Sequence, residues 1–306
     1  MRFVQILLLA GLAASAGGTP AEAAYIRIVG GAQSSAVEPI PGLEDQGYYD
    51  LTAAGGQLVE GVVVDGGGRI GEAGYAGGQS VASAAFGRLS ALGGAVAVGP
   101  PLVLPSSGLI ASGFTQAMWS DEVTLMPNDP ALLFTPARFR FEVLLSGDGG
   151  VVLTTLANQG YGNAEYSASV EVGSCPVGCQ FTRVGYWNST SPTGFDGDPL
   201  PQALTGEVGV SLGSPFVLRV SMAANATVSV GGDGSVEAFS DLRNTVLWNG
   251  ATVTDASGAP IAYRMQSTSG TDWSLPYAAP VPEPATWLTL VAGLALIGAS
   301  RSRRLR

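Results

Sequence analysis

Apolar and polar residues alternate along several short stretches of the chain, and this alternation predicts β-strands. In residues 138–143, Phe139, Phe141 and Val143 alternate with charged side chains. Successive side chains of a strand point to opposite faces, so such a stretch has one buried face and one wet face. Three further stretches share the pattern, namely residues 165–172, 216–222 and 226–230.

Clusters of turn-forming residues separate these stretches. They are rich in Gly, Asp, Asn and Ser and lie at residues 147–150, 158–163, 231–234 and 256–258. Glycine supplies positive φ angles, and Asp and Asn side chains hydrogen-bond to the nearby backbone. Short strands at this spacing are typical of all-β domains. We therefore predict an antiparallel β-sandwich or jelly-roll-like ectodomain over residues 25–279.

The first part of this ectodomain carries a weaker signal, because small residues dominate it. Residues 25–41 predict a first edge strand, with Ile26 and Ile28 as its apolar positions, followed by a linker. Residues 71–99 are rich in Ala, Gly and Ser and predict small-residue strands. Their widely spaced bulky residues leave the register of these strands undefined.

Glycine runs punctuate the segment between those two stretches. Residues 48–54 and 57–65 predict a β-hairpin, because Gly55-Gly56 fits a primed two-residue turn. Gly66-Gly67-Gly68 then predicts a surface turn. A phosphate-binding loop is disfavoured there, because no Gly-Lys-Ser/Thr follows.

The N-terminus has the features of a secretory signal peptide over residues 1–24. Arg2 precedes an apolar run at 3–16, and small residues follow up to Ala24. We expect cleavage after Ala23 or Ala24. An uncleaved anchor is the less favoured interpretation, because the apolar run is shorter than the ~20 residues of a membrane span. Export places the cysteines in an oxidising environment.

Composition excludes several classes of activity. Charged residues make up 12% of the chain, the net charge is −10, and every basic residue is Arg. Nucleic-acid binding is excluded because the ectodomain has no clustered basic residues to contact phosphates. The chain has no His. Ser-His-Asp and Cys-His catalysis and the His-Glu-x-x-His metal motif are therefore excluded, and no cofactor or metal is predicted.

Cys175 and Cys179 are the only cysteines, in the sequence Cys-Pro-Val-Gly-Cys. An even pair this close in an exported protein predicts a disulfide that closes a hairpin tip. Metal binding is the alternative, but two thiolates alone do not complete the usual four-coordinate zinc shell.

Carboxylates are the remaining catalytic groups, since two of them suffice for glycoside hydrolysis. The acids are scattered, and Glu142, Glu165 and Glu171 occupy the solvent-facing phase of their predicted strands. Asp148, Asp233 and the Asp196-Gly197-Asp198 sequence fit turns, with Ca²⁺ ligation as a second interpretation. We predict that the protein is not an enzyme.

Two tryptophans have the chemistry of a glycan contact. Trp187 and Trp248 can stack on sugar rings if both are exposed, although burial in a sandwich core is the commoner outcome for such residues.

The C-terminal tail combines three elements in a fixed order. Its start is Val281-Pro282-Glu283-Pro284, its middle is the apolar segment 285–299, and its end contains the basic cluster Arg301, Arg303, Arg304 and Arg306. The apolar middle can enter the hydrocarbon core of a membrane, and anionic lipid headgroups attract the basic end. The apolar segment spans only about 22 Å as a helix, short of the ~30 Å hydrocarbon core, which favours a transient anchor over a permanent one.

This tail, residues 280–306, resembles the PEP-CTERM sorting signal of Gram-negative bacteria. The resemblance implies a motif, a transmembrane helix and an Arg cluster that an exosortase-type protease processes at the inner membrane, followed by delivery to the cell surface or the extracellular space. Residues 239–273 also resemble the end of the ectodomain in a loose group of these proteins. The matching sequences are Asn244-Thr245, Val253-Thr254-Asp255-Ala256-Ser257-Gly258 and Ser269-Gly270-Thr271-Asp272.

From the whole sequence we expect an exported, non-enzymatic protein with a structural or adhesive role in extracellular polymer or biofilm. A carbohydrate-binding, lectin-like module is the alternative, with extracellular polysaccharide as its partner. A glycoside hydrolase is the least favoured reading.

Overall fold

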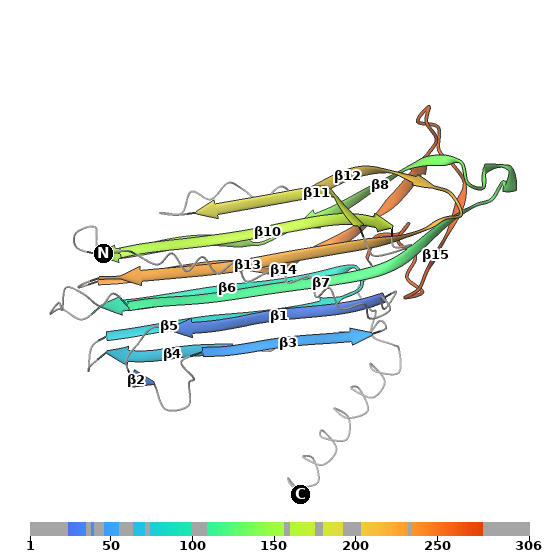
Figure 1. Cartoon of the computed structure of the whole chain (residues 1–306). Coiled ribbons are helices and arrows are strands. Elements are labelled where there is room, and N and C mark those ends of the chain that lie inside the picture. Colours follow the sequence, from blue (N-terminus) through green and yellow to red (C-terminus); the bar gives the residue numbers. More distant parts are fainter. Residues whose placement is uncertain are drawn as a thin grey trace, which may run out of the picture. The chain divides into compact units, whose positions relative to one another are not determined.

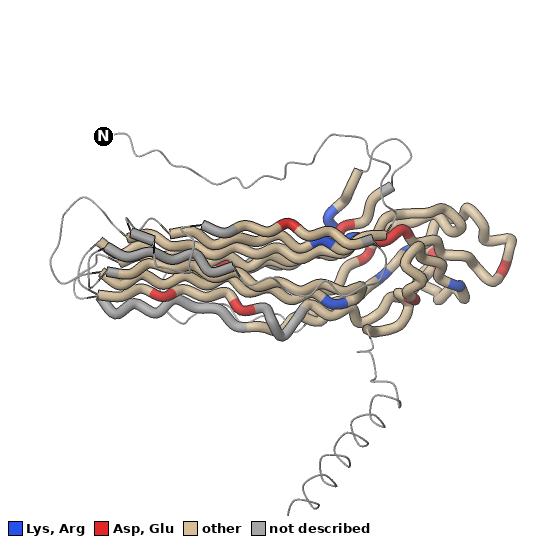
Figure 2. Tube along the Cα trace, turned by 90° about the horizontal axis from the view of Figure 1, so that it is seen from below, with Lys and Arg blue, Asp and Glu red and all other residues tan. Residues whose placement is uncertain are grey.

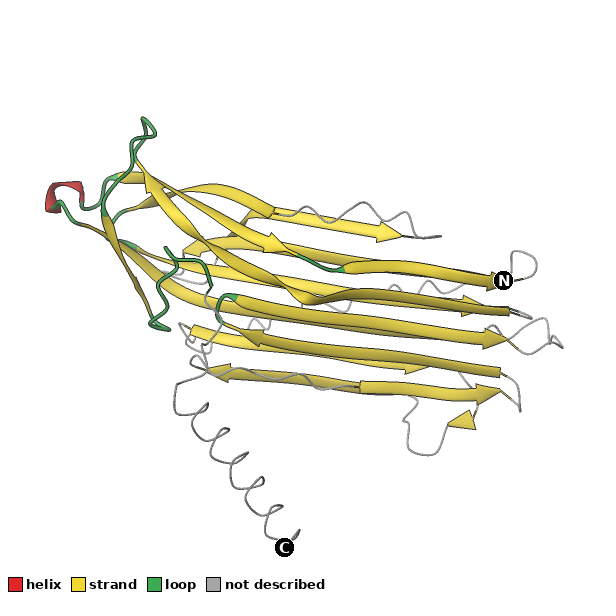
Figure 3. Ribbon diagram, turned by 180° about the vertical axis from the view of Figure 1, so that it is seen from behind, coloured by secondary structure: helices red, strands yellow, loops and turns green. Residues whose placement is uncertain are grey.

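The computed structural model describes residues 24–34, 38–39, 46–54, 64–70, 74–99, 109–155, 160–174, 180–191, 203–231 and 234–277. The chain divides into two compact units, Met1–Pro276 and Tyr277–Arg306. We call the first unit the body. Strands make up most of its described residues, and the one helix among them is the short 3-10 helix η1 (Pro130–Leu132) (Figure 3). The predicted all-β class is therefore confirmed.

Two antiparallel sheets, which we name A and B, form the body (Figure 1). Sheet A follows the order β11-β10-β13-β7-β1-β3, and β15 also pairs with β7. Its strands are β1 (Ala24–Ser34), β3 (Gln46–Ala54), β7 (Leu109–Pro127), β10 (Gly160–Ser174), β11 (Gln180–Ser191), β13 (Pro215–Val230) and β15 (Tyr263–Ser267).

Sheet B follows the order β12-β8-β14-β6-β5-β4-β2, and β9 also pairs with β14. Its strands are β2 (Glu38–Pro39), β4 (Val64–Ile70), β5 (Gly74–Ala85), β6 (Arg88–Gly99), β8 (Pro136–Leu145), β9 (Asp148–Thr155), β12 (Ala203–Ser211) and β14 (Gly234–Thr254). The inner faces of the two sheets pack together as a β-sandwich, because residues of β7 in sheet A contact the backbone of β5 and β6 in sheet B.

The alternating stretches behave as the sequence predicts. Phe139, Phe141 and Val143 of β8 are buried, while the residues between them are at least partly exposed. The stretches at 216–222 and 226–230 form a single strand, β13, whose alternate residues are buried along its whole length. A continuous strand fits both stretches because their apolar positions share one phase.

Glycine and alanine bring the two sheets unusually close at one part of the core. A Cβ atom on Gly113 of β7 would lie 2.1 Å from the carbonyl oxygen of Gln79 and 2.4 Å from that of Gly94, both in sheet B. A Cβ atom on Gly78 of β5 would lie 2.1 Å from the carbonyl oxygen of Ser112. Only glycine leaves room for these contacts between backbones. The surrounding core cluster consists of small aliphatic residues such as Ala76, Ala95, Ala97, Ala111 and Ala226.

A buried polar cluster bridges the sheets beside these glycines. The hydroxyl of Tyr49 in β3 lies 3.1 Å from Ser80 Oγ of β5 and 3.0 Å from Thr115 Oγ1 of β7. Ser80 also donates to the carbonyl oxygen of Phe114. Gly30 makes room for this cluster, since a Cβ there would lie 2.4 Å from the Tyr49 hydroxyl. The buried hydroxyls therefore satisfy one another across the core.

The glycine-rich segment of the first part of the body bears on two predictions. The turn and most of the second strand of the expected hairpin, residues 55–63, lie outside the described residues; of the neighbouring strands, β3 pairs with β1 in sheet A, and β4 pairs with β5 in sheet B. Gly66–Gly68 lie within β4, opposite Gly78, Gly77 and Ala76, and are not a surface turn. Composition alone does not distinguish a glycine within a paired strand from a glycine in a turn.

The first strand is also placed differently from the prediction. β1 lies between β7 and β3, so it is an interior strand of sheet A and not an edge. Ile26 and Ile28 are fully buried, as expected of its apolar positions. β15 pairs with β7 just beyond the start of β1, since Ala24 opposes Asp121 and Ser267 opposes Val123. The first and last strands of the body therefore lie end to end along one side of β7.

Candidate functional site

A groove lies on the outer side of sheet B, over β8, β12 and β14. It has a volume of about 570 Å³ and is lined by polar and charged side chains, among them Arg140, Glu142, Glu207 and Asn249. Gly250, with φ of +96°, sits where the register of β14 against β8 shifts between Trp248 and Ala251. Such a bulge re-aims the neighbouring side chains, here at the rim of the groove.

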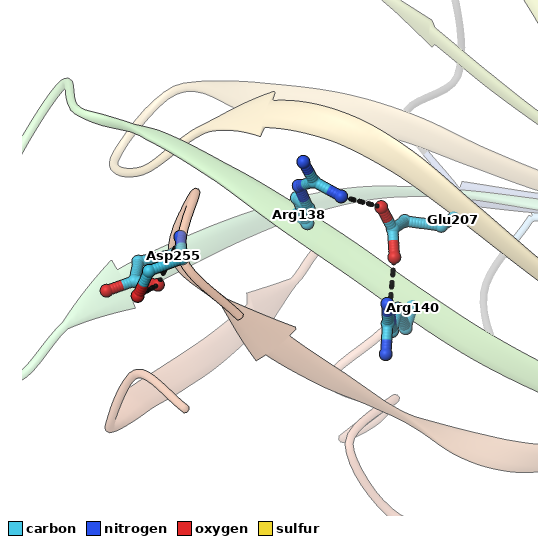
Figure 4. A network of polar contacts seen from close by, with 5 residues as sticks. Arg138, Arg140, Glu207 and Asp255 are labelled. Carbon is cyan, nitrogen blue, oxygen red and sulfur yellow. Dashed lines mark hydrogen bonds and ion pairs between the residues drawn. The ribbon is translucent and has the colours of Figure 1, made fainter. Parts of the chain in front are cut away.

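Two arginines hold the carboxylate of Glu207 in this groove (Figure 4). Arg138 Nη1 donates to Glu207 Oε1 at 2.9 Å, and Arg140 Nε donates to Oε2. β8 and β12 create the arrangement because Glu207 lies directly opposite Arg140 in the register. The hydrogen bond from Arg140, with that from Arg138, lowers the pKa of Glu207. Glu207 is therefore ionised and has both oxygens engaged.

Glu142 is the second carboxylate of the groove. Its Oε2 atom accepts a hydrogen bond of 2.7 Å from Asn249 Nδ2. A glycosidase needs one carboxyl that stays protonated near neutral pH and a second one as nucleophile or base. Because the pKa of Glu207 is lowered, the groove does not supply the protonated acid through that residue.

A buried carboxylate, Asp121 of β7, fastens the end of the body. Its side chain is fully buried and accepts three hydrogen bonds: from Ser269 N at 3.1 Å, from Ser269 Oγ and from Trp273 Nε1 at 2.7 Å. Ser269 also anchors its own turn, since its Oγ accepts from Thr271 N at 3.1 Å. We call Asp121, Ser269 and Trp273 the C-terminal lock.

An aromatic cluster surrounds the lock. The rings of Trp119 and Trp273 stack with centroids 4.2 Å apart and an interplanar angle of 10°. Trp248 meets both edge-on, and its indole N–H donates to the carbonyl oxygen of Trp273 at 2.7 Å. Phe86 contacts Trp119 and Trp273 in the same edge-on manner. These contacts join the segment after β15 to the core of both sheets.

Burial raises the pKa of Asp121, and the three donors only partly offset this effect. The folded body therefore binds a proton on Asp121 at a pH where the unfolded chain has released it. A raised pKa contributes stability that is complete below the ordinary Asp value of 3.8 and is lost as the pH rises through the raised value.

We therefore expect the stability difference between the wild type and Asp121→Asn to shrink as the pH rises from about 3 to 7. Asparagine does not titrate, so its own structural cost is a constant offset. Urea unfolding of both proteins at several pH values measures the difference. A gap that widens with pH would show that the three hydrogen bonds outweigh desolvation.

The structure removes one tryptophan from the expected glycan contact. Trp248 is 2% exposed and lies within the aromatic cluster, so its ring faces other aromatic rings and cannot stack on a sugar. The side chain of Trp187 lies outside the described residues, although its backbone belongs to β11 and pairs with Ala168. Burial of Trp248 is the commoner outcome for a sandwich aromatic.

Several other predicted sites also lie outside the described residues. These are the disulfide candidates Cys175 and Cys179, the motif Val281 to Pro284, and the basic cluster Arg301, Arg303, Arg304 and Arg306. In the part of the chain that is described, no three His, Cys, Asp or Glu side chains gather closely enough to hold a metal ion. Asp148 begins β9, whereas Asp196, Asp198 and Asp233 lie outside the described ranges.

The segment that the lock holds leads directly into the tail. Residues 280–304 match the family described as the PEP-CTERM protein-sorting motif. The chain therefore carries a PEP-CTERM sorting motif at its C-terminal end. Neither a curated protein nor a solved structure matches it. The matched residues contain both the Pro-Glu-Pro sequence and three of the four arginines of the predicted basic cluster.

The PEP-CTERM motif implies an exported protein that an exosortase processes, with transient anchoring in the membrane before release at the surface. Within the described residues, we find no helix with the length and apolar character of a membrane span. In the sequence, the C-terminal lock of the body ends a few residues before the sorting motif.

Proposed function

We propose that the body is a non-enzymatic structural or adhesive component of the extracellular polymer. The observation that carries the proposal is the outer face of sheet A, where hydroxyl and amide side chains form rows across adjacent strands. One row runs through Gln33, Ser112 and Thr227, which oppose one another in the register of β1, β7 and β13. Each of these groups both donates and accepts hydrogen bonds, as sugar hydroxyls do.

The sparse charge of the strands supports this proposal. Acidic and basic residues are few along the long strands of the body (Figure 2). On the outer face of sheet A, Arg27 and Asp50 form an ion pair of 2.6 Å, and Arg219 lies 3.5 Å from Glu171. Binding of an uncharged polymer to such a face removes water from few charged side chains. Many weak contacts along the polymer together retain the protein firmly.

The chemistry of the groove supports a non-enzymatic role. Glu207, one of the two carboxylates that line it, is held ionised by Arg138 and Arg140. That arrangement stabilises the register of β8 and β12 and opposes the proton donation that glycoside hydrolysis requires.

Fractionation of cells that express the full chain tests the proposal. We expect the protein in the extracellular polymer fraction, and we expect the purified protein to release no reducing sugars from that polymer. A Glu283→Ala variant, altered in the sorting motif, serves as the control for sorting. We expect it to stay in the membrane fraction, which distinguishes failed delivery from failed retention in the polymer. Release of reducing ends, or a delivered protein found only in the culture fluid, would contradict the proposal.

A carbohydrate-binding, lectin-like function is the second candidate. It differs from the first in requiring a defined binding site, and a pair of aromatic rings on sheet A favours it.

A further inference from the structure

Two aromatic rings lie side by side on the outer face of sheet A. Tyr48 of β3 and Phe114 of β7 flank β1, and both lie opposite Gly31 in the register. Their ring centroids are 6.4 Å apart, with an interplanar angle of 37°. Gly31 has no side chain to separate the rings and is itself buried. We call Tyr48, Gly31 and Phe114 the aromatic platform.

The platform is open to solvent, and its rings are not part of the core. Tyr48 is 65% exposed, and Phe114 is half-buried on the face that points away from sheet B. The neighbouring residues Tyr49 and Thr115, one position along each strand, point inward and form the buried hydroxyl cluster. The strands are therefore held in place by the core, and the two rings are presented on a fixed backbone.

Amide and hydroxyl groups border the platform. Asn225 lies opposite Phe114 on the side away from Tyr48. Gln33 and Gln116 are exposed and belong to the flanking rows on the same face. Apolar ring faces surrounded by groups that donate and accept hydrogen bonds match a pyranose sugar, which has a flat C–H face and a rim of hydroxyls.

We propose that the aromatic platform binds an uncharged polysaccharide, with sugar rings stacked on Tyr48 and Phe114. The proposal rests on the role in extracellular polymer given above, names the polymer, and supplies the defined binding site that the second candidate function requires. An uncharged chain fits best, because the acidic group two residues along β3, Asp50, is already paired with Arg27 through hydrogen bonds of 2.9 and 2.6 Å. An anionic polymer would find no basic cluster on this platform, and would be repelled by a chain of net charge −10.

Affinity electrophoresis of the protein purified from cells that express the full chain tests the platform. The probes are two uncharged polymers, hydroxyethyl cellulose and galactomannan, and one anionic polymer, alginate. We expect retardation by at least one uncharged polymer and none by alginate. Tyr48→Ala and Phe114→Ala should each weaken binding about tenfold, from loss of one stacked ring. Tyr48→Phe should keep most of the affinity.

Tyr161→Ala is the matched control. Tyr161 is also a tyrosine of the outer face of sheet A and is 51% exposed, but it lies on β10, away from the platform. Equal loss of binding in Tyr161→Ala and Tyr48→Ala would overturn the proposal, as would unchanged binding in both platform variants. Circular dichroism and urea unfolding of each variant establish that the fold is intact.

Two further outcomes would contradict the binding proposal, and they differ in what they imply for the proposed function. Concentration-dependent dimerisation in sedimentation velocity that Tyr48→Ala abolishes, without any polymer binding, would assign the platform to a second copy of the chain. Retention of Tyr48→Ala in the extracellular polymer fraction at the wild-type level would overturn the platform as the site of attachment. That last result would leave the structural role of the body standing, whereas absence of the wild type from the same fraction would remove both.

Discussion

Gly113→Ala is expected to destabilise the body by about 3 kcal/mol or more, or to prevent folding. The added methyl carbon would lie 2.1 Å from the carbonyl oxygen of Gln79 and 2.4 Å from that of Gly94. Both obstacles are backbone atoms of paired strands, so no side-chain rotation relieves the clash. Relief requires β7 to move away from β5 and β6, which exposes the small-residue core around Ala111.

Gly209→Ala is the matched control for this substitution. Gly209 lies in strand β12, and a Cβ there would have no atom within 4 Å. Replacing glycine by alanine lowers the conformational entropy of the unfolded chain. We therefore expect Gly209→Ala to stabilise the fold by between zero and about 1 kcal/mol. Urea unfolding measures both variants. Similar stabilities for Gly113→Ala and Gly209→Ala would show that the two sheets part without cost.

Asp121→Ala is expected to cost about 3 kcal/mol and to release the end of the body. The substitution removes the acceptor of three donors in a buried site: the indole N–H of Trp273, and the backbone N–H and the hydroxyl of Ser269. An unsatisfied buried donor costs about 1–3 kcal/mol, and here more than one donor is orphaned. Limited proteolysis with mass spectrometry should show new cleavage between residues 259 and 276.

The control for Asp121→Ala is Asp255→Ala. Asp255 also accepts three hydrogen bonds through Oδ1, from Ser257 N, Ser257 Oγ and Ala259 N, but it lies in an exposed turn. Water replaces the lost acceptor there, so we expect a much smaller loss and no new cleavage at the lock. Equal effects of the two substitutions would mean that burial of Asp121 contributes little.

The sequence predicts the body best where bulky residues mark one face of a strand. Phe139, Phe141 and Val143 define β8 because each deviation from the period would bury a charge. The prediction fails where glycine occupies a strand. Gly66–Gly68 lie within a paired strand, and Gly113 allows the close approach of two backbones. The sequence alone does not show whether a glycine belongs to a turn or to a strand.

The C-terminal lock was not foreseen, although the sequence contains a signal for it. Asp121 occupies the inward phase of β7, between Trp119 and Val123, where an apolar residue is expected. A carboxylate in that phase indicates a buried partner elsewhere in the chain. The segment Ser269 to Asp272 was recognised as the last element of the body, but alternation along one strand does not identify which distant residue it contacts.

The aromatic platform was missed for a related reason. Tyr48 and Phe114 are far apart in sequence, and each looks like an ordinary strand aromatic by itself. Only the pairing of β3 and β7 on either side of β1 brings the rings together above Gly31. Trp187 and Trp248 were singled out because tryptophan is the stronger stacking residue, yet composition does not determine which face a ring takes.

The end-to-end placement of β1 and β15 along β7 has a consequence for the order of folding. Secretion delivers β1 early and residues 263–273 last, so β7 keeps a vacant strand position until almost the whole body has crossed the membrane. Until then the ring of Trp119 lacks its stacking partner. The sandwich therefore closes only once residues 263–273 are present. A chain truncated before them leaves this strand position on β7 unpaired, and we expect it to be exposed to strand addition and proteolysis before sorting.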